Sequence, residues 1–77
     1  MTRAEFLMEI ETILESDSGS LSGTEELSGL EMWDSLAVLS YIAMVDENFG
    51  INVPGRKVNE CKTVNDLVAI VADQLTD

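Results

Sequence analysis

The chain has no histidine and only one each of cysteine, proline, tryptophan and tyrosine among its 77 residues. Without histidine it lacks the commonest general base and metal ligand, so we expect no metal site and no catalytic centre of its own. A single cysteine cannot form an internal disulfide and suits a reducing compartment. No apolar run is long enough to span a bilayer, and no basic-then-apolar leader is visible. We therefore expect a cytoplasmic protein without membrane insertion.

Basic residues are also scarce. The chain contains four Lys and Arg residues and fifteen Asp and Glu residues, which give a formal net charge of −11. This charge argues against nucleic acid and anionic membranes as partners and favours proteins with basic patches. A chain of this length buries only a modest core. We expect residues 1–77 to form a single monomeric domain.

The first predicted helix begins at a capping box, in which Thr2 caps the helix and Glu5 reaches back. Apolar residues at helical spacing follow to about residue 15. They are Phe6, Ile10, Ile13 and Leu14. The acidic residues of this segment are predicted to form a solvated face: Glu5, Glu9, Glu11 and Glu15.

Residues 16–34 are predicted to be a long polar loop, because serine, aspartate and glycine compete with helical hydrogen bonding. Leu21, Leu27 and Leu30 are isolated apolar residues that could attach the loop to the rest of the fold. The loop is not a calcium site of the helix–loop–helix type. If Asp17 were the first ligand, the third and fifth positions would be Gly19 and Leu21, which supply no side-chain oxygen.

The second predicted helix covers residues 36–49. Its core stripe is predicted to be Leu39, Ile42, Val45 and Phe49, and its outer side Leu36, Ala37, Ser40, Met44 and Glu47. Gly50 should supply a left-handed C-cap, with Ile51 folding back onto the helix end.

The last third of the chain contains an extended connection, a short turn and a third main helix. Pro54 and Gly55 should keep residues 51–55 out of a helix, a single helical turn is predicted within residues 56–61, and Cys61 should be a small buried residue. Thr63 and Asp66 form a second capping box. The apolar stripe that follows is Val64, Leu67, Val68, Val71 and Leu75. The predicted fold is all-α: a small irregular bundle of three main helices, a short helix in third position, and a long loop between the first and second helices.

Asp34 and Ser35 stand where the loop becomes the second helix. Asp34 is a good N-cap residue, and Ser35 would occupy the first turn with its hydroxyl outward, beside the positive end of the helix dipole. A phosphate on that hydroxyl would be stabilised by the dipole and by free amides. Taken by itself, an Asp-Ser pair is most simply a cap and nothing more.

Three segments of the chain resemble the carrier-protein family, which includes acyl carrier proteins and their peptidyl-carrier relatives. They are residues 29–36 (Gly-Leu-Glu-Met-Trp-Asp-Ser-Leu), 47–51 (Glu-Asn-Phe-Gly-Ile) and 63–67 (Thr-Val-Asn-Asp-Leu). The resemblance implies that Ser35, between Asp34 and Leu36, carries a covalent 4′-phosphopantetheine arm from coenzyme A. The arm's thiol would hold an acyl group as a thioester. The chain would then be a non-catalytic substrate of a phosphopantetheinyl transferase.

The resemblance also implies a docking surface for a loading ligase or transferase and for downstream synthases. By position it comprises Trp33, Ala37, Ser40, Met44 and Glu47, together with Arg56 and Lys57. The uncharged Ala37 and Ser40 of the second helix and the basic Arg56 and Lys57 of the third segment favour a specialised pathway over general fatty-acid synthesis, with polyketide synthesis also open. Asp34 before the serine favours an acyl cargo. The alternatives are an aminoacyl or peptidyl carrier of a nonribosomal-peptide-type system and an unmodified acidic helical interaction module.

Overall fold

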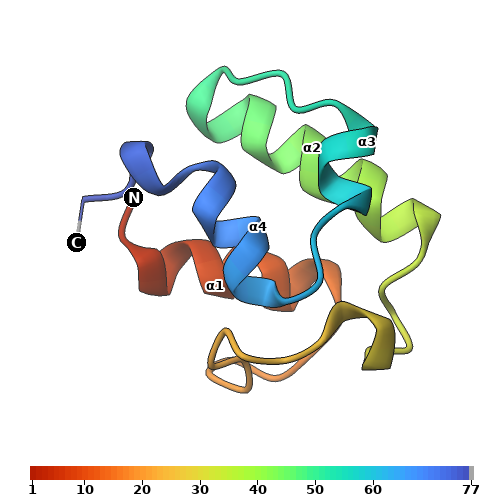
Figure 1. Ribbon diagram of the computed structural model, residues 1–77. Helices are drawn as coiled ribbons and strands as arrows, with labels where there is room; N and C mark the ends of the chain where they lie inside the picture. Colours follow the sequence, from red (N-terminus) through yellow and green to blue (C-terminus); the bar gives the residue numbers. More distant parts are fainter. Residues whose placement is uncertain (77) are drawn as a thin grey trace.

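The computed structural model describes residues 1–76, which form four α-helices and two short 3-10 turns. The α-helices are α1 (Arg3–Ile13), α2 (Ser35–Phe49), α3 (Gly55–Asn59) and α4 (Val64–Ile70), and the 3-10 turns are η1 (Leu27–Gly29) and η2 (Ala72–Gln74). The closest helix pairs are α1 with α2, α2 with α3, and α1 with α4 (Figure 1). α2 and α4 lie across the core from each other and are joined by the hydrogen bond from the Tyr41 hydroxyl to the Leu67 carbonyl. The predicted all-α bundle with a short third helix is confirmed.

The ends of α1 and α2 follow the local sequence signals. The Glu5 backbone N–H donates to the Thr2 hydroxyl (3.1 Å), and the Thr2 N–H donates to Glu5 Oε1 (2.9 Å), which completes the predicted capping box. Gly50 closes α2 with φ +67°, and its N–H donates to the Asp46 carbonyl (2.8 Å). α1 ends slightly before the predicted residue 15.

The capping box of α4 is also present. The Asp66 N–H donates to the Thr63 hydroxyl (3.3 Å), and the Asp66 carboxylate accepts from the backbone N–H groups of Lys62 (2.8 Å) and Thr63 (3.1 Å). These two backbone bonds, that of Lys62 first, lower the pKa of the Asp66 carboxyl. The observed helix α4 is shorter than the predicted apolar stripe, which runs on to Leu75. The chain leaves the α-helix after Ile70 and forms the 3-10 turn η2.

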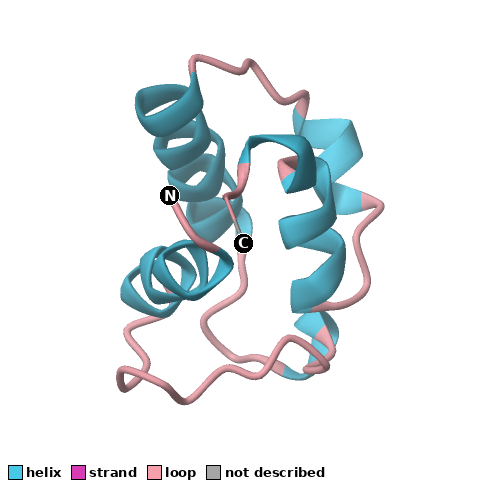
Figure 2. Ribbon diagram, turned by 90° about the vertical axis from the view of Figure 1, so that its left-hand side faces the viewer, coloured by secondary structure: helices cyan, strands magenta, loops and turns pink. Residues whose placement is uncertain are grey.

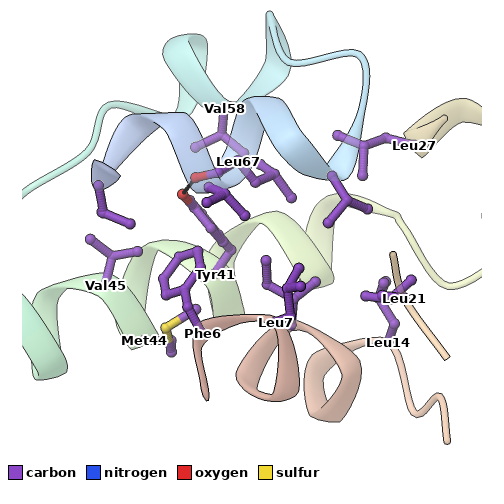
Figure 3. Packing of buried hydrophobic residues seen from close by; sticks show 14 of the residues in the cluster. Phe6, Leu7, Leu14, Leu21, Leu27, Tyr41, Met44, Val45, Val58 and Leu67 are labelled. Carbon is purple, nitrogen blue, oxygen red and sulfur yellow. Dashed lines mark hydrogen bonds between the residues drawn. The ribbon is translucent and has the colours of Figure 1, made fainter. Parts of the chain in front are cut away.

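The core is a single cluster of apolar side chains from every helix and from the long loop (Figure 3). Tyr41 is the largest wholly buried residue, and its ring packs edge-on against that of Phe6, with centroids 6.1 Å apart and planes at 81°. The other wholly or almost wholly buried residues are Ile10, Leu14, Leu27, Val45, Val53, Val58, Val64, Leu67 and Val71. Ile13, Ile51 and Leu75 are only partly buried against this cluster.

The buried side of α2 differs from the predicted side. Leu39, which we predicted in the core, is 62% exposed, whereas Ala37 and Met44, predicted on the outside, are buried. Apolar residues lie all around this helix, so periodicity alone does not choose the inward face. The rotation is decided by the fit of the Tyr41 ring into the core, where Val45 also lies. Ile42 and Phe49 pack at the core's edge.

Glu11 is not part of a solvated face, contrary to the sequence prediction. Its side chain is only 3% exposed. One carboxylate oxygen accepts the backbone N–H of Gly19 (3.0 Å) and the other that of Leu21 (3.0 Å). The carboxylate therefore fastens the start of the long loop to α1, and helical spacing alone could not show that the loop would return to cover it.

The long loop is anchored along its length. Leu21 and Leu27 are buried and Leu30 is partly buried, as predicted for the three apolar attachments. The loop also forms η1, and residues 23–27 run beside the segment that enters α4 (Figure 2). Their backbone bonds are Asn65 N–H to the Gly23 carbonyl (2.8 Å), Val64 N–H to the Glu25 carbonyl (3.1 Å) and Leu27 N–H to the Lys62 carbonyl (2.8 Å).

Two details of the α3 region differ from the prediction. The helix starts at Gly55, one residue before the predicted turn, because extended Pro54 serves as its N-cap. Cys61 is partly exposed rather than buried, and its thiol donates to the Lys57 carbonyl (3.6 Å). Desolvation, with a smaller contribution from nearby Asp66, raises the pKa of the thiol, so Cys61 is a poor nucleophile at neutral pH.

Gly23 occupies a position where any side chain would be strained and crowded. Its φ is +115°, and a Cβ built there would lie 2.6 Å from an Arg3 guanidinium nitrogen and 2.9 Å from Asn65 Cγ. That Cβ would also disturb the hydrogen bond from Arg3 to Asn65 Oδ1 (2.6 Å). We expect Gly23→Ala to lower the free energy of unfolding by about 2 kcal/mol, measured by urea denaturation. Gly29, where a Cβ would meet nothing within 4 Å, is the matched control. Equal small effects at both positions would contradict the close packing at Gly23.

Stability should also fall in mild acid. The Glu25 carboxylate accepts the backbone N–H groups of Ser22 (2.9 Å) and Gly23 (2.9 Å), and these bonds, that of Ser22 first, lower its pKa below the ordinary 4.5. A lowered folded-state pKa contributes stability that is complete above the unfolded-state value and is lost as the pH falls through the folded-state value. We expect the urea midpoint of the protein to decline as the pH falls. The stabilising contribution of Glu25 should decrease below about pH 4.5, and that of Asp66 below about pH 3.8. The decline should be shallower in a Glu25→Gln variant, and an unchanged pH profile would contradict this role.

No helix among residues 1–76 combines the length and apolar character needed to cross a bilayer.

Candidate functional site

The first turn of α2 has the geometry that the sequence predicts. Asp34 is the N-cap, in extended conformation, and its Oδ1 accepts the backbone N–H of Ala37 (2.9 Å). The Asp34 carbonyl accepts the N–H of Val38 (3.0 Å), the first bond of the helix. Ser35 is therefore the first helical residue of a fifteen-residue helix, where the dipole presents positive charge.

The Ser35 side chain is exposed. Within the part of the chain that the structure describes, its hydroxyl makes no hydrogen bond, and the backbone N–H groups of Ser35 and Leu36 likewise have no acceptor. A free hydroxyl beside two free amides at a positive helix end can accept a phosphoryl group and stabilise its charge.

A series of tight turns leads from the loop into α2. The Leu30 N–H donates to the Leu27 carbonyl (3.1 Å), the Trp33 N–H to the Leu30 carbonyl (3.0 Å) and the Asp34 N–H to the Met32 carbonyl (3.1 Å). Leu27 is buried in the core, and Leu30 and Trp33 are partly buried against it. Ser35 is thus presented to solvent from a segment that is hydrogen-bonded and packed rather than free.

The predicted docking residues do not form one surface. Ala37 and Met44 are buried in the core, so their predicted outward placement is wrong. Trp33 and Ser40 are partly exposed. Of the predicted set, three residues are fully on the surface: Glu47, Arg56 and Lys57.

Exposed apolar side chains lie next to Ser35. Leu36 is 70% exposed and Leu39 is 62% exposed, and their spacing of three residues places them on the same face of α2. Met32, just before the helix, is 43% exposed. Neither Leu39 nor Met32 is among the docking residues predicted from the sequence. An N-cap at Asp34 combined with an inward Tyr41 would have indicated which face of α2 remains outside.

The described residues contain no group of three or more Cys, Asp or Glu side chains arranged to hold a metal ion. Ser35 lies beside Asp34, whose carboxylate is engaged by the Ala37 amide as a cap. The site therefore offers a hydroxyl that can accept a phosphoryl group and a helix end that stabilises an anion.

Comparison with known proteins identifies a family for this arrangement. The family model described as a phosphopantetheine attachment site matches residues 4–71, nearly the whole chain. Neither the curated proteins nor the solved structures gave a match. Domains of this family are generally non-catalytic carriers, which interact with a modifying transferase and with synthase enzymes. The chain belongs to the phosphopantetheine-attachment family of carrier proteins, whose members bear 4′-phosphopantetheine covalently.

Proposed function

We propose that Ser35 is the attachment residue and that residues 1–77 act as a single, discrete acyl carrier domain. The observation that carries the proposal is the exposed, unbonded Ser35 hydroxyl at the start of α2, in a chain that the family model covers from residue 4 to residue 71. Asp34 secures the helix start without occupying the serine hydroxyl.

In the attachment step, the Ser35 Oγ attacks the phosphorus of coenzyme A that carries the pantetheine. The bond from that phosphorus to the oxygen bridging the two phosphates breaks, and 3′,5′-ADP leaves. The serine proton passes to a base on the transferase. The chain's own contribution is an accessible hydroxyl, together with the positive helix end that stabilises the new phosphodiester.

When attached, the group supplies a flexible arm with a terminal thiol that carries the acyl cargo as a thioester. The domain supplies the surface that partner enzymes recognise, and tethering raises the local concentration of the cargo at each of them. A net charge of −11 favours partners with basic surfaces. Leu36 and Leu39, exposed beside Ser35, offer those partners an apolar contact. We propose that they include a loading ligase or transferase and a downstream synthase.

The test is intact mass after incubation with coenzyme A and a broad-specificity phosphopantetheinyl transferase. We expect a gain of one phosphopantetheine group, located by peptide mapping on the segment that contains Ser35, and no gain when the transferase is omitted. No gain, or a gain mapped to another segment, would overturn the proposal. The first of these outcomes would leave the unmodified interaction module as the remaining explanation.

The kind of cargo requires a second experiment. The protein that bears the phosphopantetheine arm is incubated with acyl and aminoacyl donors and their loading enzymes, and thioester formation is measured by mass. Asp34 before the serine favours an acyl cargo, for a specialised pathway or for fatty-acid or polyketide synthesis. Loading by aminoacyl donors alone would establish the alternative, an aminoacyl or peptidyl carrier.

A further inference from the structure

Tyr41 holds α2 and α4 together across the core. Its side chain is wholly buried, and its hydroxyl donates to the Leu67 carbonyl of α4 (2.6 Å) (Figure 3). α2 and α4 are not among the closest helix pairs, so the tyrosine side chain spans the distance between them. Burial raises the pKa of the Tyr41 hydroxyl well above its ordinary value.

The Leu67 carbonyl that Tyr41 uses does not receive the hydrogen bond from Val71 that a regular helix would supply. In a regular α-helix, the Leu67 carbonyl would accept the N–H of Val71. Here the Val71 N–H donates instead to the Val68 carbonyl (3.1 Å), as α4 tightens into η2. The tyrosine hydroxyl thus donates to the Leu67 carbonyl in place of the Val71 N–H. Buried acceptors are costly to leave unpaired.

We propose that Tyr41 closes the interior of the bundle to the cargo, so that this carrier holds short or polar acyl groups in solvent rather than burying a long chain. This inference rests on the proposed attachment at Ser35. An alkyl chain entering between α2 and α4 would have to displace the tyrosine ring. The exchange replaces one buried apolar group by another of similar size, so it gains little, and it breaks the hydrogen bond from the Tyr41 hydroxyl to the Leu67 carbonyl.

The neighbouring surfaces support the same conclusion. Val45, Val58 and Leu67 belong to the same core cluster as Tyr41 and are themselves wholly buried (Figure 3). An open hollow beside α3 and α4 does exist, but charged side chains form most of its lining and would not attract an alkyl chain. They are Lys57, Glu60, Lys62, Asp66 and Asp73.

The experiment compares acetyl and octanoyl forms of the protein, made with a broad-specificity transferase from the corresponding acyl-coenzyme A. In the natural sequence we expect the two forms to melt at the same temperature and their amide NMR signals for Val45, Val58 and Leu67 to coincide. In Tyr41→Leu, which vacates part of the ring's volume, the octanoyl form should melt about 4 °C or more above the acetyl form. The matched control is Phe49→Leu, the same loss of a ring at the partly buried far end of α2, which should show no such difference.

Each result bears on the inference. A higher melting temperature or shifted core signals for the octanoyl form of the natural sequence would overturn it, and this arm needs no variant. A folded Tyr41→Leu that shows no dependence on chain length would remove Tyr41 as the cause. Failure to load either acyl group would instead count against attachment at Ser35, because that step is measured separately by mass.

Discussion

Ser35→Ala is expected to abolish attachment of the phosphopantetheine arm and to leave the helical fold intact. The variant removes the exposed hydroxyl, the only atom of this residue that can form the phosphodiester. It keeps Asp34, whose carboxylate caps the helix through the Ala37 N–H (2.9 Å). Intact mass after treatment with coenzyme A and transferase should show no gain. The free energy of unfolding should change by less than about 0.5 kcal/mol, as for other surface substitutions.

The matched control is Ser28→Ala, at another exposed serine, in η1. It should be modified as fully as the natural sequence. Modification of Ser35→Ala would show that another residue bears the arm. Loss of helical circular dichroism in Ser35→Ala would show that Ser35 is needed for the fold, and the loss of loading would then have a different explanation.

Glu11→Ala is expected to destabilise the domain by about 3 to 4 kcal/mol, because it removes two charge-assisted hydrogen bonds at a buried position. The Gly19 and Leu21 N–H groups, each 3.0 Å from a carboxylate oxygen of Glu11, would lose their acceptors. The Leu21 bond is fully buried, so water cannot readily replace the lost oxygen there. Urea denaturation followed by circular dichroism measures the change. For a small domain it is a large part of the total stability.

Glu9→Ala serves as the control, because Glu9 is on the same helix and only partly buried. It should change the free energy of unfolding by less than about 0.5 kcal/mol. Similar effects at the two positions would mean that the loss at Glu11 comes from general helix electrostatics rather than from its bonds to the loop. Glu11→Gln should lie between Glu11→Ala and the natural sequence, since the amide oxygen can still accept one of the two N–H groups.

The helix boundaries and the place of Ser35 at the start of α2 depend on interactions between residues close in the chain, and so they could be predicted. Both capping boxes join residues three positions apart, and the left-handed Gly50 ends α2 by its own backbone preference. The Asp34 cap also joins residues three apart. It places Ser35 in the first turn whatever the rest of the bundle does.

The rotation of α2 and the role of Glu11 depend on contacts between distant segments. Leu39 and Met44 are both apolar and both compatible with a helix, but only the docking of Tyr41 against Phe6 and Leu67 shows that Leu39 is outside and Met44 inside. This is why two of the predicted docking residues proved to be core residues.

The sequence by itself determined the helical class, the caps and the exposed serine, because these follow from periodicity and from hydrogen bonds within one turn of the chain. Only the tertiary structure decided which apolar residues of α2 remain exposed, that Glu11 secures the long loop, and that Tyr41 fills the space between α2 and α4. The physical reason is that burial and long-range hydrogen bonds are properties of the packed bundle. Several faces of the same helix would have satisfied the local pattern equally well.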